Sequence, residues 1–467
     1  MSHAAAADVI VVGAGLAGHC AALAAAEGGA EVVLVEKTAR TGGSSRMSAG
    51  SFAFAGTDLQ RAAGIHDSPE SLVAELTRVS GGRADPALVG LYVERQADTF
   101  EWLGAHGVKF HPITLSSNTS VPRTHPTDPN QLIEALHARA TGHPRIRYRS
   151  GTALTGLLPH VGRAGVNGAM LRTGRADSEL AASRGVVLAC GGFTRNRALV
   201  QRHAPDLVQA QAWGGVGNTG DALTLAGARG AALVDMEFVT GTFGVAINHY
   251  PDLRVDADDS LWLRMAMYRG GIAVNRNADR FADESQSYKV LAGGCLAQPD
   301  AVAFQIFDQS IMDTSVENPS VNDLRGAYAR GLVRRADSIE ALATSVGLDP
   351  ARLVATVERY NRGVAAGRDP DFGRATLAAG YGKPVPIASP PFYALPCTTA
   401  LLSTYCGLRV DARMRVLTQG GAPIDGLYAA GEAVGGFHGA GYMSGTALGK
   451  AAIFGRVAGE QAAGNRT

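Results

Sequence analysis

Apolar runs long enough to span a membrane, an excess of one charge sign and closely spaced cysteines are all missing from this 467-residue sequence. The one long apolar stretch is an alanine-rich segment near the start, so no membrane span is expected. Lys and Arg number 43 against 42 for Asp and Glu, a balance that gives no sign of a nucleic-acid partner or of binding to an anionic membrane. A first strand is expected by Asp8, which leaves no room for a secretory signal.

The five cysteines are an odd number and none shows CxxC or CxxCH spacing. This scarcity argues against an attached c-type haem, an iron–sulfur cluster or a metal site. Unpaired, scattered cysteines are typical of core or loop positions in a reduced compartment. We therefore expect a cytoplasmic protein.

What the sequence does contain is a strand–turn–helix–strand pattern over residues 8–37. Val9–Val12 predicts a buried parallel strand, an alanine-rich helix follows, and Glu31–Val35 predicts a second strand. The pattern is typical of a dinucleotide site, with the pyrophosphate at the helix N-terminus. The alternative is a glycine-rich turn that binds nothing.

Each glycine of this pattern has an expected role. Gly13 permits the tight turn, Gly15 lets the backbone approach a pyrophosphate, and Gly18 lets the helix pack on the strand. Glu36 ends the second strand, where its carboxylate can bond a ribose hydroxyl.

The remaining sequence predicts an α/β fold interrupted by an insertion. Strand–helix alternation continues to about residue 235, then charges and long helical patterns increase, and a proline-rich stretch at 384–391 precedes a return to strand patterns. The predicted parts are residues 1–237, an inserted domain at 238–389, and a second part of the first domain at 390–467.

Six segments together resemble the flavoprotein subunits of the fumarate reductase and succinate dehydrogenase family. They are VVGAGLAG, TGGSSRMSAG (41–50), LACGGF (188–193), NTGDAL (218–223), GGIAVNRNADRFADE (270–284) and GLYAAGEAVGGFHGAGYMSGTALG (426–449). The resemblance implies a Rossmann-like FAD-binding domain with an inserted α+β capping domain. Substrate is then expected between cap and flavin.

The resemblance implies FAD as the cofactor, because GlyGlu after a strand is how the family holds the ribityl chain. The helix from Thr446 would stabilise the reduced flavin with its positive end. Ser44 stands where some members carry a flavin-linked histidine, so non-covalent FAD is expected. The implied cofactor-binding residues are Gly13, Gly15, Ala17, Gly18, Glu36, Lys37, Thr41, Gly42, Gly43, Ser44, Ser48, Ala49, Gly50, Ala153, Ala189, Gly191, Asn218, Asp221, Gly431, Glu432, Thr446, Ala447 and Leu448.

Three departures from the family's fumarate pattern concern the substrate. Tyr288 stands in place of an arginine acid, Ser403 precedes ThrTyrCysGly where a histidine is usual, and Tyr442 stands in place of a second arginine. An arginine fork suits a carboxylate, and a tyrosine does not replace it. Fumarate or succinate is therefore a doubtful substrate.

The replacements are similar to those of 3-ketosteroid Δ1-dehydrogenases and related cyclic-ketone desaturases. That resemblance implies Tyr288, Tyr442 and Gly445 as catalytic residues: Tyr442 and the Gly445 N–H polarise the ketone, and tyrosinate takes the α proton while the β hydrogen leaves as hydride to flavin N5. A tyrosine can act as base if neighbouring donors or cations lower its pKa from about 10. Which tyrosine is the base stays open, and each could instead be a packing residue.

Arg264, His125 and Ser403 are further substrate-binding candidates, Arg264 for the carboxylate of a keto acid. The alternatives are a solvated arginine and a loop-ordering histidine. Together these residues predict a dehydrogenase (desaturase) of a small cyclic ketone or keto acid such as 4-oxocyclohexanecarboxylate.

Three alternatives stay open. They are an ene-reductase, a tricarballylate- or fumarate-type oxidoreductase, and a flavin-bound electron-transfer subunit. The electron acceptor is equally open: oxygen, a quinone or a carrier protein.

Overall fold

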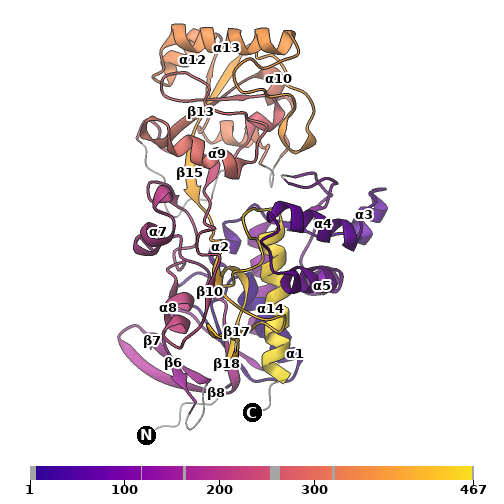
Figure 1. The fold of residues 1–467 in the computed structure, drawn as a ribbon, viewed down its shortest axis with the longest axis vertical. Helices are drawn as coiled ribbons and strands as arrows, with labels where there is room; N and C mark the ends of the chain where they lie inside the picture. Colours follow the sequence, from indigo (N-terminus) through magenta and orange to yellow (C-terminus); the bar gives the residue numbers. More distant parts are fainter. Residues whose placement is uncertain (1–6, 117, 161–164, 253–262, 318–320, 465–467) are drawn as a thin grey trace. The chain divides into compact units, whose positions relative to one another are not determined.

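The computed structural model describes residues 7–116, 118–160, 165–252, 263–317 and 321–464. Its internal contacts divide the chain into two compact units, one of Met1–Ala204, Gly214–Val239 and Ser403–Thr467, the other of Pro205–Trp213 and Thr240–Leu402 (Figure 1). The predicted boundary at residue 389 falls earlier than this division, because the strand from Phe392 to Leu401 pairs within the second unit.

A twisted, mostly parallel sheet forms the centre of the first unit. Its order is β17 (Arg415–Leu417), β18 (Pro423–Ala429), β8 (Ala176–Leu188), β1 (Ala7–Val12), β2 (Val32–Val35) and β5 (Ile146–Arg149). All neighbours from β18 to β5 run parallel, and β1 and β2 are almost wholly buried. Continuous burial explains why these strands read as unbroken valine runs. The predicted α/β class and both predicted strands are confirmed.

Strand β8 is continuously buried only at its end, in the parallel sheet. Its first part forms an antiparallel hairpin with β7 (Val166–Thr173), which also pairs with β6 (Thr152–Pro159). Polar residues alternate with apolar ones there, since the hairpin buries one face at most.

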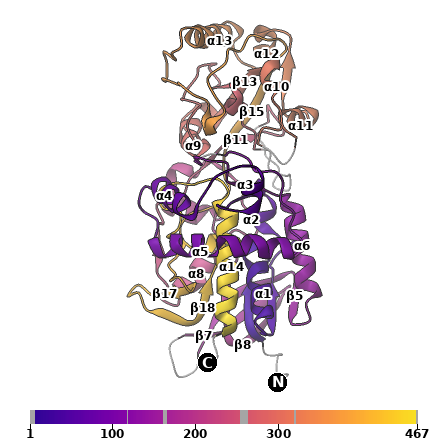
Figure 2. The same ribbon diagram turned by 90° about the vertical axis from the view of Figure 1, so that its right-hand side faces the viewer.

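Helices of the first unit include α1 (Leu16–Glu27) and α14 (Thr446–Gly464), which lie side by side (Figure 2). Small residues let the two backbones approach. A Cβ atom on Gly455 would lie 2.4 Å from the carbonyl oxygen of Ala17, and one on Gly459 would lie 2.2 Å from that of Ala21. The other elements of this unit are α2 (Gly43–Arg46), β3 (Ser51–Ala53), α3 (Asp58–Ala62), α4 (Pro69–Val79), α5 (Pro86–Ala105), β4 (Thr124–Pro126), α6 (Pro129–Gly142), α7 (Arg197–His203), α8 (Asp221–Gly227), β10 (Leu233–Val234) and β16 (Gly407–Leu408).

The second unit is an antiparallel sheet with helices. Its strands are β11 (Thr242–Ala246), β15 (Phe392–Leu401), β13 (Val302–Asp308), β12 (Ile272–Val274), β14 (Arg334–Ala336) and β9 (Gln211–Ala212), of which β9 alone runs parallel to its neighbour β15. Its helices are α9 (Tyr288–Leu296), α10 (Gln309–Met312), α11 (Leu324–Ala329), α12 (Ile339–Ser345) and α13 (Pro350–Ala365).

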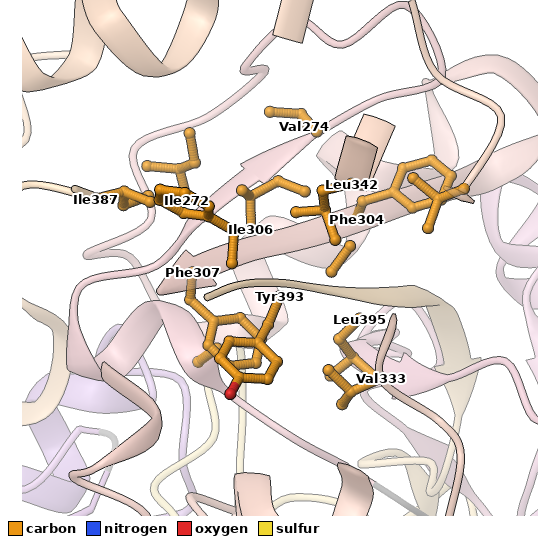
Figure 3. Packing of buried hydrophobic residues seen from close by; sticks show 14 of the residues in the cluster. Ile272, Val274, Phe304, Ile306, Phe307, Val333, Leu342, Ile387, Tyr393 and Leu395 are labelled. Atoms are coloured by element: carbon orange, nitrogen blue, oxygen red, sulfur yellow. The ribbon is translucent and has the colours of Figure 1, made fainter. Parts of the chain in front are cut away.

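The core of the second unit lies along β13 and β15. Figure 3 shows Phe304, Ile306 and Leu395 in this core, with the ring of Phe307 stacked on that of Tyr393 at a centroid distance of 5.3 Å. Because each of these side chains is buried, the unit has a hydrophobic core of its own.

Across the residues that the structure describes, no helix is both long enough and apolar enough to cross a bilayer.

The α1–α14 contact predicts the effect of one added methyl group. Gly459→Ala would push Cβ into the Ala21 carbonyl, and such overpacking costs about 1–3 kcal/mol. Urea unfolding should show this loss. Gly104→Ala in α5 is the matched control: its Cβ meets nothing within 4 Å, so stability should stay constant or rise by up to about 1 kcal/mol. Equal urea midpoints for Gly459→Ala and Gly104→Ala would show that the α1–α14 contact does not require glycine at position 459.

Candidate functional site

The turn between β1 and α1 is built from close backbone contacts. Gly13 has φ of +102°, and a Cβ atom there would lie 2.5 Å from the carbonyl oxygen of Ala189 at the end of β8. A Cβ on Gly18 would lie 1.7 Å from the carbonyl oxygen of Gly13. Both positions therefore require glycine for packing, whatever the turn binds.

Gly15 differs from its two neighbours in the motif. The nearest atoms to a Cβ at Gly15 are the Gly42 carbonyl oxygen and Ser45 Oγ, both at 3.7 Å, and nothing lies within 4 Å of one at Gly43. Ser45 Oγ accepts the N–H of Leu16 at 3.2 Å. The other first-turn N–H groups of α1 have no partner within the helix. This open turn beside a helix N-terminus fits the pyrophosphate of a dinucleotide.

The carboxylate of Glu36 closes the turn from the other side. One oxygen accepts the Ala14 N–H at 2.9 Å, and the other accepts the N–H and hydroxyl of Thr38 at 2.9 and 2.8 Å. The oxygen that accepts the Ala14 N–H has a second lone pair, so the expected bond to a ribose hydroxyl stays compatible with these contacts. The role of Glu36 in ordering the turn was not predicted.

Lys37 and Asp221, both expected at the cofactor, pair with each other. Lys37 Nζ lies 2.7 Å from Asp221 Oδ2 and donates to Thr219 Oγ at 2.6 Å. The contact ties the end of β2 to the start of α8, and both side chains keep about a quarter of their surface exposed.

A chain of polar side chains joins three separate segments. Ser44 Oγ accepts the Gly215 N–H at 3.0 Å and Asn218 Nδ2 at 3.1 Å. Asn218 Nδ2 also donates to Glu432 at 2.7 Å, and the Thr404 N–H donates to the other Glu432 oxygen at 2.8 Å. Burial raises the pKa of Glu432. Thr404 is a member of this group that the sequence did not single out.

The remaining predicted cofactor residues belong to the first unit as well, in the loops and element ends around the turn, β6, β8 and α14. They are Ala17, Thr41, Gly42, Ser48, Ala49, Gly50, Ala153, Ala189, Gly191, Gly431, Thr446, Ala447 and Leu448.

The amino end of α14 holds Tyr442. Burial raises the pKa of its phenol, while hydrogen bonds from the backbone N–H groups of Gly445 and Ala447 act in the opposite direction. The Tyr442 ring stacks on Tyr405 at a centroid distance of 5.2 Å. Gly445, with φ of +91°, leaves no room for a Cβ beside the backbone of Phe52. A phenol with a raised pKa stays protonated and is a hydrogen-bond donor.

Tyr288 is the first residue of α9, in the second unit. The segment that leads to it is held by a buried ionic group, which we call the arginine–carboxylate cluster: Arg280, Glu284, Asp369 and Arg374. Arg280 lies 2.7 Å from Glu284 and 2.9 Å from Asp369, and Arg374 lies 3.2 Å from Glu284. Through these contacts the ArgPheAlaAspGlu motif (280–284) anchors the segment before Tyr288 in the second unit.

Arg264 does not behave as the solvated arginine weighed against a substrate role, since only 6% of it is exposed. Its guanidinium donates to the carbonyl oxygens of Asp323 and Leu263 at 2.8 and 2.9 Å, and Nη2 lies 3.4 Å from Asp323 Oδ2. Burial lowers its pKa to about 10. These bonds to its own unit weaken the case for a substrate carboxylate at Arg264. Trp262, two residues earlier, lies outside the described residues.

His125 is fully buried in β4, and its ring nitrogens both have partners. Nδ1 lies 2.8 Å from the Arg123 carbonyl oxygen and Nε2 lies 2.7 Å from Thr57 Oγ. Burial lowers its pKa to about 4. The carbonyl can only accept, so Nδ1 carries the proton and Nε2 accepts from the hydroxyl. These bonds favour the loop-ordering role of His125 over the substrate-binding one. Ser403 is half-buried and lies two residues after the end of β15.

A family model described as an FAD binding domain matches residues 8–448. The chain belongs to this FAD-binding family. FAD, the predicted cofactor, is thereby confirmed.

Relatives in the family support the predicted resemblance. A urocanate reductase of Eggerthella lenta is 31% identical over 465 residues, which are 98% of this chain and 74% of that protein. The open conformation of a flavocytochrome c3 fumarate reductase shares 30% identity and a TM-score of 0.86, covering 100% of this chain and 79% of that one. A 3-ketosteroid-Δ4-(5α)-dehydrogenase from Rhodococcus jostii RHA1 shares 26% identity and a TM-score of 0.75, covering 98% and 96%. At this coarse level the chain is an FAD-dependent oxidoreductase acting on carbon–carbon bonds, as predicted.

Ser44 predicts how the cofactor is held. Its hydroxyl is engaged by Gly215 and Asn218, and it offers no imidazole for a covalent flavin link. Acid precipitation of the purified protein should therefore release all of the yellow flavin into the supernatant. Flavin that stays with the pellet would contradict non-covalent binding.

The two bonds of the His125 ring predict a structural phenotype. His125→Leu leaves the Arg123 carbonyl and the Thr57 hydroxyl unpaired, at a cost of about 1–3 kcal/mol. Because the folded pKa lies below the unfolded value of about 6.5, wild-type stability should fall as pH drops from 6.5 towards 4, and the variant should lose part of this dependence. Thermal unfolding across this pH range measures both.

His66→Leu, at an exposed histidine, is the control and should change neither quantity. Lost substrate turnover in His125→Leu with an unchanged unfolding temperature would restore the substrate-binding role.

Proposed function

We propose that this protein is a dehydrogenase (desaturase) that introduces a C=C bond next to the carbonyl group of a small cyclic ketone or keto acid, such as 4-oxocyclohexanecarboxylate. The observation that carries the proposal is the Tyr442 phenol at the amino end of α14, bonded by the Gly445 N–H. Bound FAD would supply a hydride acceptor. The residues of the chain must then polarise the carbonyl and remove a proton.

Tyr442 has the properties of the polarising group in this proposal. Its raised pKa keeps the hydroxyl protonated, so it can donate a hydrogen bond to a ketone oxygen. The neighbouring N–H groups belong to the first turn of α14, where the helix dipole favours negative charge. Charge that develops on the ketone oxygen during proton removal would be stabilised there.

Tyr288 is assigned as the base. The phenol of Tyr442 is held neutral, which makes it a poor proton acceptor, and this supports Tyr288 for the second role. Tyr288 also stands where the fumarate pattern has an arginine, so the chain has exchanged a cationic acid for a group that can take a proton when ionised.

The substrate's other end has no assigned partner. Arg264 was the candidate for a carboxylate, but its bonds to Asp323 and Leu263 engage much of its guanidinium. A neutral cyclic ketone and a keto acid are therefore equally compatible with the described residues, and the electron acceptor is left unassigned.

A second candidate is reduction of an unsaturated acid, the reverse chemistry. It is supported by the 31% identity to a urocanate reductase and the 30% identity to a fumarate reductase. The tyrosines at 288 and 442 speak against a dicarboxylate, because a phenol cannot replace the two donors of a guanidinium fork.

Anaerobic mixing of the oxidised holoprotein with single compounds tests the proposal. 4-Oxocyclohexanecarboxylate or cyclohexanone should bleach the flavin band near 450 nm, since the flavin accepts the hydride. Tyr288→Phe should slow bleaching by about 10²-fold or more, the usual contribution of a general base. Tyr328→Phe, at an exposed tyrosine of the same unit, is the control and should bleach as wild type.

Other compounds in the same assay separate the alternatives. Bleaching by succinate alone would overturn the ketone proposal in favour of dicarboxylate chemistry. If no compound bleaches the oxidised flavin, while urocanate or another unsaturated acid reoxidises the reduced flavin, the second candidate replaces the first.

A further inference from the structure

Lys289 lies beside Tyr288 in space as well as in sequence. Its Nζ is over the face of the Tyr288 ring, 5.5 Å from the ring centroid. Consecutive residues of a helix normally point about 100° apart, so this contact is not given by adjacency. It occurs at the first turn of α9, where Ser287 caps the helix by accepting the Lys289 N–H at 3.3 Å.

The Lys289 side chain is partly shielded from water. It donates a hydrogen bond to the hydroxyl of Thr242, a residue of β11 that is 1% exposed. Burial lowers the pKa of Lys289 to about 7. A cation in such a place interacts strongly with a nearby ionisable group, because little solvent screens the two.

The other ionisable groups on the elements packed against α9 do not supply a free anion. Burial raises the pKa of Cys295 to about 12 and raises that of Cys397, so both thiols stay neutral. Asp308 accepts backbone N–H groups, Asp300 pairs with Arg276 at 2.8 Å, and Asp206 is exposed. Tyr393 of β15 donates its hydroxyl to Gln309. The Tyr288 ring is an ionisable group that the ammonium covers.

We propose that Lys289 is a positioning residue that stabilises the tyrosinate form of Tyr288 and so prepares it to take the substrate proton. The role of Tyr288 as a base rests on the proposed function. The electrostatic interaction between Lys289 and Tyr288 does not depend on it. The proton from the substrate carbon ends on the Tyr288 oxygen, and Lys289 keeps its own proton during this transfer.

The coupling has a defined sign. A positive charge within about 6 Å favours the ionised phenol, and a phenolate in turn favours the charged amine. The two groups therefore titrate as a pair, and removing the cation should move the tyrosine midpoint upward.

Difference titration of the holoprotein measures this directly. Tyrosinate absorbance near 295 nm is followed against pH, and the curve of Tyr288→Phe is subtracted to isolate Tyr288. The same subtraction is made in Lys289→Met, Lys289→Gln and Lys289→Arg backgrounds. The flavin contribution cancels because each pair contains the same cofactor.

Lys289→Arg, whose guanidinium stays charged, should give a midpoint below about 10, and the two uncharged variants a midpoint at least one pH unit higher, a tenfold weaker acid. Wild type should lie between them, because its amine is only partly charged in this pH range. Lys383→Met, at an exposed lysine of the same unit, should leave the midpoint unchanged. Using two uncharged variants guards against misfolding of either, which circular dichroism monitors. Equal tyrosine midpoints in Lys289→Arg and both uncharged variants would overturn the proposal.

Ketone bleaching of the same variants separates this inference from the function on which it rests. Slower bleaching in Lys289→Met and Lys289→Gln, relieved by raising pH, supports both. A shifted midpoint with bleaching unchanged in Tyr288→Phe would retain the lysine–tyrosine coupling and overturn Tyr288 as the base.

Discussion

The architecture of the first unit depends on one contact, the approach of α1 to the turn that precedes it. Gly18 and the carbonyl of Gly13 are so close that any side chain at Gly18 would occupy the space of the carbonyl oxygen. This contact fixes the direction in which α1 leaves the sheet. It thereby aims the helix N-terminus at the open space beside Gly15 and sets α1 in line to receive α14.

Local signals made the sheet and the turn predictable. Valine runs specify buried parallel strands, and glycines at fixed offsets specify the turn, because both effects act between residues close in sequence. The Ser44–Asn218–Glu432 chain could not be derived in that way. Its members lie 174 and 214 residues apart, and only the family resemblance brought all three into one list.

Expectation and structure differ most where residue type was known and surroundings were not. An arginine and a histidine are natural ligands for a substrate, but Arg264 and His125 are buried and bonded by carbonyl groups of their own units. The prolines at 384–391 end one segment, yet the strand after them still pairs with β13, since strand pairing is decided by partners far along the chain. Lys289 is a related case. The sequence shows that it follows Tyr288, but it does not show that its side chain lies over the Tyr288 ring.

The arginine–carboxylate cluster has a consequence for how this protein can change over time. Two guanidinium groups and two carboxylates cancel in charge inside the second unit, with Arg280 and Glu284 four residues apart and the other two supplied by a distant loop. Replacing a single member would strand a buried charge, which is strongly destabilising. Related sequences that change one of the four positions are therefore expected to change another as well, so that the buried charges still cancel.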